Sequence, residues 1–208
     1  MNLGWRVVLL TDLADRVVEV SGTRRPTVVA VNGHSSSGKT TLAGRLVDVL
    51  PDAAVLHTDD LARDQGVFAW DVLLRDEVLP VVRAGEPLNY PPPPWWQARG
   101  RTGSVTLPGS LRYLVVEGVG ASQASVRDAY DLVIWVETDE PTRLTRDLLR
   151  LAAGEMASPG AYAGWMAEEN AYTTHERPWE HADLLVYGGE SIAYDPATEV
   201  VTSDVSGG

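Results

Sequence analysis

Apolar residues along this chain fall into two patterns that alternate. Short continuous apolar runs, which are typical of buried strands, lie at 27–32, 53–57, 111–117, 132–136 and 184–187. Apolar residues at helical spacing lie around and between them, at 9–20, 39–50, 71–84, 124–129, 141–153 and 161–174. Continuous apolar strands that alternate with helices indicate a parallel sheet. We therefore predict an α/β fold built on a five-stranded parallel sheet with helices on both faces.

The segments outside this pattern divide the chain into regions but not into domains. Two stretches rich in glycine and proline, 85–110 and 154–161, are predicted to be loops. No repeat or linker interrupts the pattern, so we expect one domain over 1–208. Residues 1–26 are expected to form an N-terminal helical extension, and residues 189–208 a C-terminal tail that adds no more than an edge element.

Composition narrows the class of protein. Hydrophobic residues make up 44% and charged residues 22%, as in soluble globular proteins. The net charge of −12 argues against a nucleic-acid partner, because affinity for the phosphate backbone needs clustered cations. The chain has no cysteine, which excludes disulfides and thiolate metal sites. The apolar run after Met1 is short and soon meets Asp12, so we expect a cytoplasmic enzyme without a membrane partner.

The most informative motif is GHSSSGKT at residues 33–40, which follows a predicted strand and opens a predicted helix. Its lysine, Lys39, is the only one in a chain with sixteen arginines, which indicates a site that needs a compact ammonium. Gly33 and Gly38 let backbone N–H groups surround phosphates, and Thr40 offers its hydroxyl to Mg²⁺. The motif therefore predicts a nucleotide phosphate-binding loop. Its expected ligand contacts are Gly33, Ser35, Ser36, Ser37, Gly38, Lys39, Thr40 and Thr41.

Carboxylates stand where two of the predicted strands end. Asp59 and Asp60 follow one strand, and Glu117 ends another. Because the carboxyl ends of parallel strands share an edge, we expect these acids beside the phosphate loop. Phosphoryl transfer needs an acid near magnesium and an acid that accepts the proton of a hydroxyl. We assign magnesium to Thr40, Glu117 and Asp59, and the proton to Asp59. Capping a helix is the alternative role for Asp59, and Asp60 could share either task.

Three arginines are spaced by three and four along the predicted helix 141–153. Arg143, Arg146 and Arg150 therefore share one helical face. A solvated surface is the alternative for any charged helix. Because this helix follows a strand of the phosphate-binding sheet, we expect Arg146 and Arg150 to close over the transferring phosphate. They would belong to a helical lid at 140–160.

Several segments, taken in order, resemble one family. GHSSSGKTTLA, HTDDLA, VVEGVGA, RLTRDLLR and ADLLV together resemble the uridine kinase and phosphoribulokinase-like branch of P-loop kinases, over about residues 27–188. The resemblance implies a P-loop NTPase fold, the cofactors ATP and Mg²⁺, and transfer of the γ-phosphate to a small-molecule hydroxyl. It matches Asp59 to the acid that activates the acceptor, Glu117 to a glutamate near magnesium and acceptor, and Arg146 and Arg150 to the lid. Assembly as a homo-oligomer stays open.

The sequence departs from the family where the acceptor would bind. Uridine kinases carry a tyrosine followed by an aspartate that holds the ribose hydroxyls, whereas Tyr90 is followed by four prolines, Trp95 and Trp96. We therefore expect an acceptor other than uridine. The stiff proline segment could present the tryptophans to a substrate or pack them against the core or a subunit interface. Arg99 and Arg101, just beyond, could meet an anionic substrate or face solvent.

The other aromatic residues and the histidines suggest packing. Trp135 lies within a predicted strand and is expected in the core. Trp165 and Tyr172 lie two helical turns apart on one face, where packing is favoured over substrate contact. The four histidines lack metal-ligand spacing and are expected to be structural, with His57 alone near the chemistry.

Two other function classes also use a phosphate-binding loop. A regulatory GTPase needs an Asn-Lys-x-Asp motif, which cannot exist here because Lys39 is the only lysine. A P-loop ATPase or a binding module without a small acceptor would make Asp59 dispensable, and the carboxylates and lid arginines argue against it. Among kinases, a nucleoside kinase is the alternative to a kinase acting on a different metabolite, which the missing aspartate favours.

Overall fold

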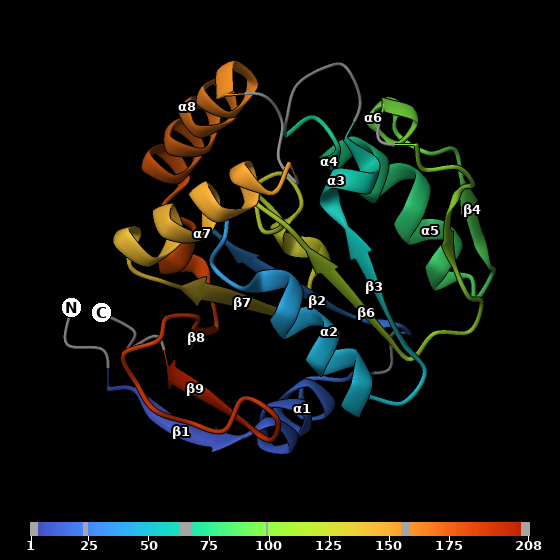
Figure 1. The fold of residues 1–208 in the computed structure, drawn as a ribbon. Coiled ribbons are helices and arrows are strands. Elements are labelled where there is room, and N and C mark those ends of the chain that lie inside the picture. Colours follow the sequence, from blue (N-terminus) through green and yellow to red (C-terminus); the bar gives the residue numbers. More distant parts are fainter. Residues whose placement is uncertain (1–3, 23–24, 63–67, 99, 155–158, 205–208) are drawn as a thin grey trace.

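The computed structural model describes residues 4–22, 25–62, 68–98, 100–154 and 159–204. A seven-stranded sheet organises them, in the order β1-β9-β8-β7-β2-β6-β3 (Figure 1). The strands are β1 (Arg6–Leu9), β9 (Glu199–Asp204), β8 (Leu184–Tyr187), β7 (Leu132–Glu137), β2 (Thr27–Gly33), β6 (Tyr113–Glu117) and β3 (Ala53–His57). The five strands from β8 to β3 pair in parallel, which confirms the predicted α/β fold and its five parallel strands.

The two remaining strands were not predicted. β9 pairs antiparallel with β8 on one side and with β1 on the other, so the C-terminal tail enters the sheet instead of lying at its edge. The N-terminal extension likewise contains a strand before its helix. The sequence signal was weak in both, because three of the four β1 residues are exposed and β9 buries Thr202 and Ser203 beside its valines.

Helices α1 (Leu10–Glu19) and α2 (Lys39–Val49) cover one face of the sheet. Leu13 and Val17 of α1 pack in one cluster with Leu46 of α2 and with alternate residues of β2, Val29 and Val31. Leu13, Val17 and Leu46 are at most 1% exposed. Burial of this apolar stripe explains why a short N-terminal helix is part of the core.

The opposite face is covered by elements between β3 and β6. A continuous helical run, α4 (Asp71–Leu73), a π-helical turn (Leu74–Val78) and α5 (Leu79–Arg83), matches the helix predicted at 71–84. The predicted loop at 85–110 instead holds a hairpin and a short helix. These are β4 (Leu88–Tyr90), β5 (Val105–Leu107) and α6 (Pro94–Ala98). Strands of three residues are too short for an alternating pattern to appear in the sequence.

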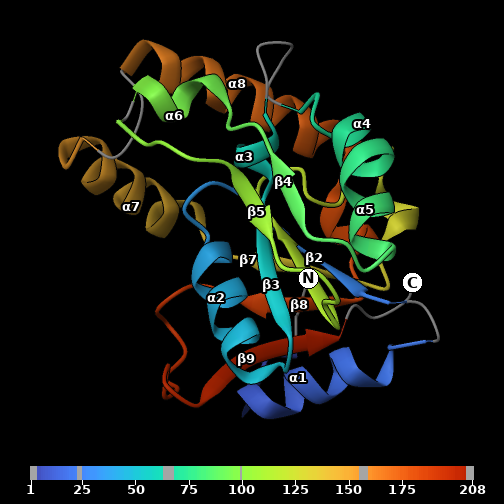
Figure 2. The ribbon, with the colours of Figure 1, turned by 90° about the vertical axis from the view of Figure 1, so that its right-hand side faces the viewer.

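The remaining helices lie near the carboxyl ends of the parallel strands. They are α3 (Thr58–Leu61), α7 (Glu140–Ala152) and α8 (Pro159–Glu176), with 3₁₀ turns at Arg127–Ala129 and Pro178–His181. The first 3₁₀ turn is shorter than the helix predicted at 124–129. Figure 2 shows α3, α6 and α8 at one end of the molecule and α1 at the other. Of the predicted lid at 140–160, residues 155–158 lie outside the described ranges.

Within the described ranges, no helix has both the length and the apolar character needed to cross a lipid bilayer.

Replacing Leu13 with Ala tests the packing of α1. The Leu13 side chain is 1% exposed, so the cavity left behind should lower the free energy of unfolding by about 2–5 kcal/mol. Val18 on the same helix is 44% exposed, and Val18→Ala should change the free energy by no more than about 0.5 kcal/mol. Denaturant titration of both variants measures the difference. Equal effects would contradict the packing of α1 against the sheet.

Candidate active site

The phosphate loop connects β2 to α2 and allows no side chain at its start. A Cβ on Gly33 would lie 2.7 Å from the backbone oxygen of Val136 on the neighbouring strand. Gly38 precedes α2 with φ of 99°, a left-handed conformation that favours glycine. The first N–H groups of α2 have no partner within the helix and make its start a favourable place for an anion. The two glycines therefore shape a cradle that suits phosphate.

Lys39 is buried at the start of α2. Its Nζ donates a hydrogen bond to the backbone oxygen of His34, 2.6 Å away on the same loop. Burial lowers the pKa of Lys39, although the negative charges of Glu117, Glu169 and Asp59 act in the opposite direction. The lysine ammonium thus lies across the loop, among three carboxylates.

Glu117, at the end of β6, is buried but has partners. Thr40 Oγ1 donates to both of its carboxylate oxygens at 3.2 Å, and His57 Nδ1 lies 2.5 Å from its Oε1. The hydrogen bond to Glu117 raises the pKa of His57. Gly118 follows without a side chain, because a Cβ there would overlap Thr58 Oγ1. His57, which the sequence placed only near the chemistry, therefore contacts a candidate magnesium ligand directly.

Asp59 lies in the first turn of α3 and opens into the cleft beside Glu117. The N-cap position of this helix belongs to His57, so the alternative role of Asp59 as a helix cap is not observed. Asp59 is exposed to the cleft, but the protein atoms near it displace part of its hydration. This partial loss of hydration raises its pKa, and the negative charge of Glu117 adds to the effect. A carboxylate with a raised pKa is a better proton acceptor than an ordinary aspartate.

A cleft of about 940 Å³ joins these groups. The predicted site residues in its wall are Ser35, Ser36, Gly38, Lys39, Thr40, Thr41, Asp59, Glu117, Arg146 and Arg150. The two other predicted loop residues, Gly33 and Ser37, are buried and are not part of the cleft wall. The far wall is formed by the segment after β8, which includes Tyr187, Glu190 and Tyr194. The cleft is therefore long enough to pass from the carboxylates, over the loop, to the C-terminal segment.

Two of the three α7 arginines reach the loop directly. Arg146 Nη1 donates to the backbone oxygens of Gly188, at 2.9 Å, and Ser36, at 3.3 Å. Its Nη2 forms an ion pair with Glu190. Arg150 Nη1 donates to Ser36 Oγ at 3.3 Å. This face of α7 is therefore turned to the phosphate loop, and the solvated-surface alternative does not describe it.

The tryptophans after the proline run pack against α3. Trp96 is 6% exposed and its Nε1 donates to Asp60 Oδ1 at 2.9 Å, while Trp95 Nε1 donates to the backbone oxygen of Asp59. The Arg101 guanidinium carbon lies 3.9 Å from the centre of the Trp96 ring. The buried carboxylate of Asp60 thus accepts a hydrogen bond from Trp96 and is not part of the cleft wall. Packing, not substrate stacking, accounts for Trp96.

Tyr90, another predicted substrate residue, is not among the residues of the cleft wall. Tyr90 ends β4, opposite Val105 of β5. Arg99 lies outside the described residues. The segment nevertheless matters to the site, because both tryptophans hold the short helix that carries Asp59.

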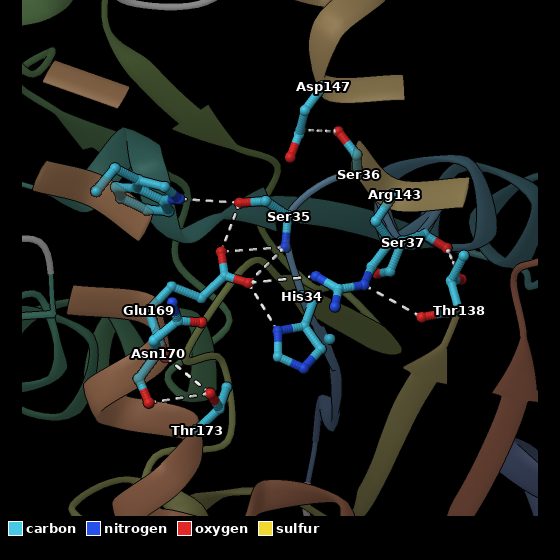
Figure 3. Close-up of polar contacts among 12 residues, drawn as sticks. His34, Ser35, Ser36, Ser37, Thr138, Arg143, Asp147, Glu169, Asn170 and Thr173 are labelled. Atoms are coloured by element: carbon cyan, nitrogen blue, oxygen red, sulfur yellow. Dashed lines mark hydrogen bonds and ion pairs between the residues drawn. The ribbon is translucent and has the colours of Figure 1, made fainter. Parts of the chain in front are cut away.

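Sequence reasoning missed the residue that contacts the loop most extensively, Glu169 of α8 (Figure 3). Ser35 donates to its carboxylate from the backbone N–H, at 3.1 and 3.2 Å, and from Oγ, at 2.6 Å. His34 Nδ1 lies 2.7 Å from the same carboxylate and Arg143 Nη1 lies 4.0 Å away. Burial alone would raise the pKa of Glu169, but the hydrogen bonds from His34 and Ser35 outweigh it and lower the pKa to about 2.

Asp147 of α7 holds the next loop residue. Ser36 Oγ donates to Asp147 Oδ1 at 2.5 Å, and Tyr162 OH donates to the other oxygen at 2.8 Å. Ser36 has φ of 56°, a left-handed conformation that costs a non-glycine residue about 1–2 kcal/mol. The hydrogen bond that Ser36 donates to Asp147 helps to offset that cost and holds the loop at this residue.

The aromatic face of α8 has one side chain in the cleft and one in the core. Trp165 lines the cleft and its Nε1 donates to Ser35 Oγ at 2.8 Å. Tyr172 is 8% exposed and accepts a hydrogen bond from Asn32 Nδ2. Trp165 and Glu169 are four residues apart, one helical turn. A carboxylate in line with an aromatic stripe was the available sequence signal for Glu169.

Oxygen ligands for a hard cation gather at one edge of the loop. Among the described residues, no three histidines or carboxylates lie close enough to cage a metal ion. Magnesium usually takes only one or two protein oxygens and completes its octahedron with phosphate and water. Thr40, Glu117 and Asp59 therefore fit an ion that arrives with a nucleotide.

The charge on Glu169 should make the stability of the protein depend on pH in acid. Its pKa falls from 4.5 to about 2 on folding, so its stabilising effect is complete above pH 4.5 and is lost as the pH falls through 2. Denaturant titration from pH 7 to 2.5 should show that Glu169→Gln is less stable than wild type, with a gap that narrows below pH 4.5. The exposed neighbour provides a control, Glu168→Gln, with no such gap. A pH-independent gap would contradict the ionised contact.

Comparison with known proteins finds relatives that are similar to this chain in sequence or in fold. A uridine kinase from Deinococcus deserti is 31% identical over 151 residues, which cover 63% of this chain and 71% of the relative. A possible uridine kinase from Bacillus stearothermophilus has the same fold, with a TM-score of 0.58, 20% identity, and coverage of 85% of this chain and 96% of the other. D-glycerate 3-kinase from Cryptococcus neoformans superposes with a TM-score of 0.54 and 13% identity over 92% and 98%. No family model matches the chain.

The uridine kinase from Deinococcus deserti is similar enough in sequence, over enough of its own length, to show the family of this chain. The fold comparisons agree with it, and they bear on the fold alone. The chain belongs to the uridine kinase and phosphoribulokinase-like branch of P-loop kinases, and it is a phosphotransferase with a hydroxyl acceptor.

Proposed function

We propose that this protein transfers the γ-phosphate of ATP to a hydroxyl of a small molecule other than uridine. The observation that carries the proposal is the single cleft that joins Lys39, the Thr40–Glu117 pair and Asp59. In-line phosphoryl transfer needs a phosphate cradle, a cation site and a proton acceptor at one place. Residues suited to each of these tasks lie in the cleft wall and were also indicated by the sequence, which supports the proposal.

Each group has a distinct role in the proposed reaction. The loop and the start of α2 bind the β- and γ-phosphates, with Lys39 neutralising part of their charge. Thr40 and Glu117, with Asp59 nearby, would hold Mg²⁺, which when bound supplies positive charge to the phosphate oxygens. Asp59 orients the acceptor hydroxyl and accepts its proton. Arg146 and Arg150 of α7 stabilise the charge on the migrating phosphoryl group.

The proposed class of acceptor follows from the residues near Asp59 and in the cleft wall. The family's ribose-binding aspartate after the tyrosine is absent, and Trp95 is bonded to the backbone of Asp59 instead. Val119 and Trp165 add apolar surface to the wall of the same cleft. These features support a non-nucleoside metabolite, such as a sugar or a vitamin precursor. A nucleoside other than uridine is the second candidate.

The wider arrangement follows from the same proposal. We infer that residues 1–208 act as one catalytic domain and that the region 140–160 works as its lid. The cytoplasm is the proposed location, since a kinase of this kind draws on the ATP pool there. Its proposed partner is a small molecule.

An acceptor screen tests the proposal. Purified protein with ATP and Mg²⁺ is offered nucleosides, sugars and vitamin precursors, and ADP release is recorded. ADP release that depends on one acceptor class supports a kinase and names that class. Equal ADP release with and without every acceptor would contradict the kinase and favour a P-loop ATPase.

Replacing Asp59 with Asn should lower kcat by about 10²–10⁴-fold, because the amide cannot accept the proton. The affinity for ATP, measured by calorimetry, should change little. Asp60→Asn is the matched control, since its remaining oxygen can still accept the bond from Trp96 and it lies outside the cleft wall. Turnover unchanged in Asp59→Asn, or lost equally in both variants, would remove Asp59 as the base.

Replacing Arg150 with Ala should slow transfer more than it weakens ATP binding. Loss of one cation that acts mainly in the transition state costs about 10²–10³-fold in kcat. Arg75→Ala serves as the control, because Arg75 is exposed and paired with Asp76 away from the cleft. Steady-state kinetics with ATP varied separates the two effects. A rise in KM for ATP with kcat unchanged would contradict the lid assignment.

A further inference from the structure

Glu169 is a buried carboxylate whose partners lie in the phosphate loop. It is 0% exposed, although it stands on a helix more than a hundred residues away in sequence. Burying a carboxylate is costly unless it is paired and hydrogen-bonded. Its hydrogen-bond donors are His34 and Ser35, from the first half of the loop. The position of α8 is thus fixed by the loop, and the shape of the loop by α8.

The contact from Ser35 N–H is the unusual part of this arrangement. Backbone N–H groups of such a loop normally face the nucleotide phosphates. Here one of them points instead at the two oxygens of Glu169. A peptide bond held in this way has one orientation, so the following residues, Ser36 to Lys39, start from a fixed position.

Ser35 also connects Glu169 to an aromatic residue of the cleft wall. Its hydroxyl donates to Glu169 and accepts from Trp165 Nε1, so the three side chains form one chain of hydrogen bonds. Trp165 is in the cleft wall with Asp59. A cooperative chain of this kind is stiffer than its separate bonds.

Arg143 extends the network to α7. Its Nη1 lies 4.0 Å from Glu169 and its Nε donates to the backbone oxygen of Thr138. Thr138 in turn donates from Oγ1 to the backbone oxygen of Ser37, in the second half of the loop. Figure 3 shows Glu169, Ser35, Arg143 and Thr138 converging around the loop. Glu169 of α8 therefore contacts the first half of the loop, and Arg143 of α7 connects it through Thr138 to the second half.

We propose that Glu169 is a positioning residue of the phosphotransfer reaction, which presets the phosphate loop for nucleotide and connects it through Ser35 to Trp165 in the cleft wall. The inference rests on the proposed function, because it assigns the benefit of the preset loop to ATP. It differs from a packing role in what it predicts. A packing residue stabilises the fold, whereas a positioning residue also sets the affinity of the folded protein for nucleotide.

The test compares Glu169→Gln with wild type and with Glu168→Gln, the exposed neighbour on the same helix. Glutamine has the same shape, but its amide nitrogen cannot accept the bonds that one carboxylate oxygen accepts. Titration calorimetry with ATP and Mg²⁺ reports the dissociation constant, and its stoichiometry reports the competent fraction separately. Ser35→Ala, which keeps the backbone contact and loses the hydroxyl, is the second variant if Glu169→Gln folds poorly.

The expected result is a rise in the dissociation constant for ATP of about 10-fold or more in Glu169→Gln, at full stoichiometry and below the melting temperature. Ser35→Ala should give a smaller rise, and Glu168→Gln none. An unchanged dissociation constant in Glu169→Gln, or in Ser35→Ala if the first variant is unfolded, overturns the positioning role. Wild-type protein that does not bind ATP would remove the proposed function and this inference with it, so the two failures are distinguishable.

Discussion

This structure depends on one constraint, which is that the phosphate loop must keep backbone N–H groups turned toward a ligand. Such a loop cannot satisfy its own polar groups, so neighbouring elements must hold it. Gly33 allows it to pass against the β7 backbone, while Ser36 adopts a left-handed conformation. Carboxylates from α7 and α8, Asp147 and Glu169, then bind the serines that the glycines leave between them.

The same constraint organises the charges. The chain carries a net charge of −12, yet its only lysine and two of its arginines meet at the loop. The negative charges of Glu117, Glu169 and Asp59 act on the buried Lys39 ammonium and oppose the effect of burial on its pKa. Negative charge on Asp59 and Glu117 also prepares the edge where magnesium would bind. Cations and carboxylates therefore lie close together at the site, although the protein as a whole is acidic.

The sequence could predict the features that depend on local pattern. The five parallel strands are continuous apolar runs, and the phosphate loop is a spaced motif, so both were recognised. The edge strand β1 and its neighbour β9 were missed, because β1 is only four residues long and its pairing partner, β9, is at the other end of the chain. Contacts between distant segments were also beyond the sequence. Nothing near Trp96 indicates that it would bond to Asp60, and the spacing of Glu169 from Trp165 does not identify Ser35 as its partner.

These observations lead to one central claim, that the cleft moves a phosphoryl group from a nucleotide to a hydroxyl rather than to water. The most direct measurement is ³¹P nuclear magnetic resonance of the wild-type protein with ATP, Mg²⁺ and a pool of candidate hydroxyl compounds. We expect the γ-phosphate signal of ATP to disappear as a new phosphomonoester signal grows in equal amount. Growth of inorganic phosphate alone, at the same rate with and without the pool, would contradict the claim.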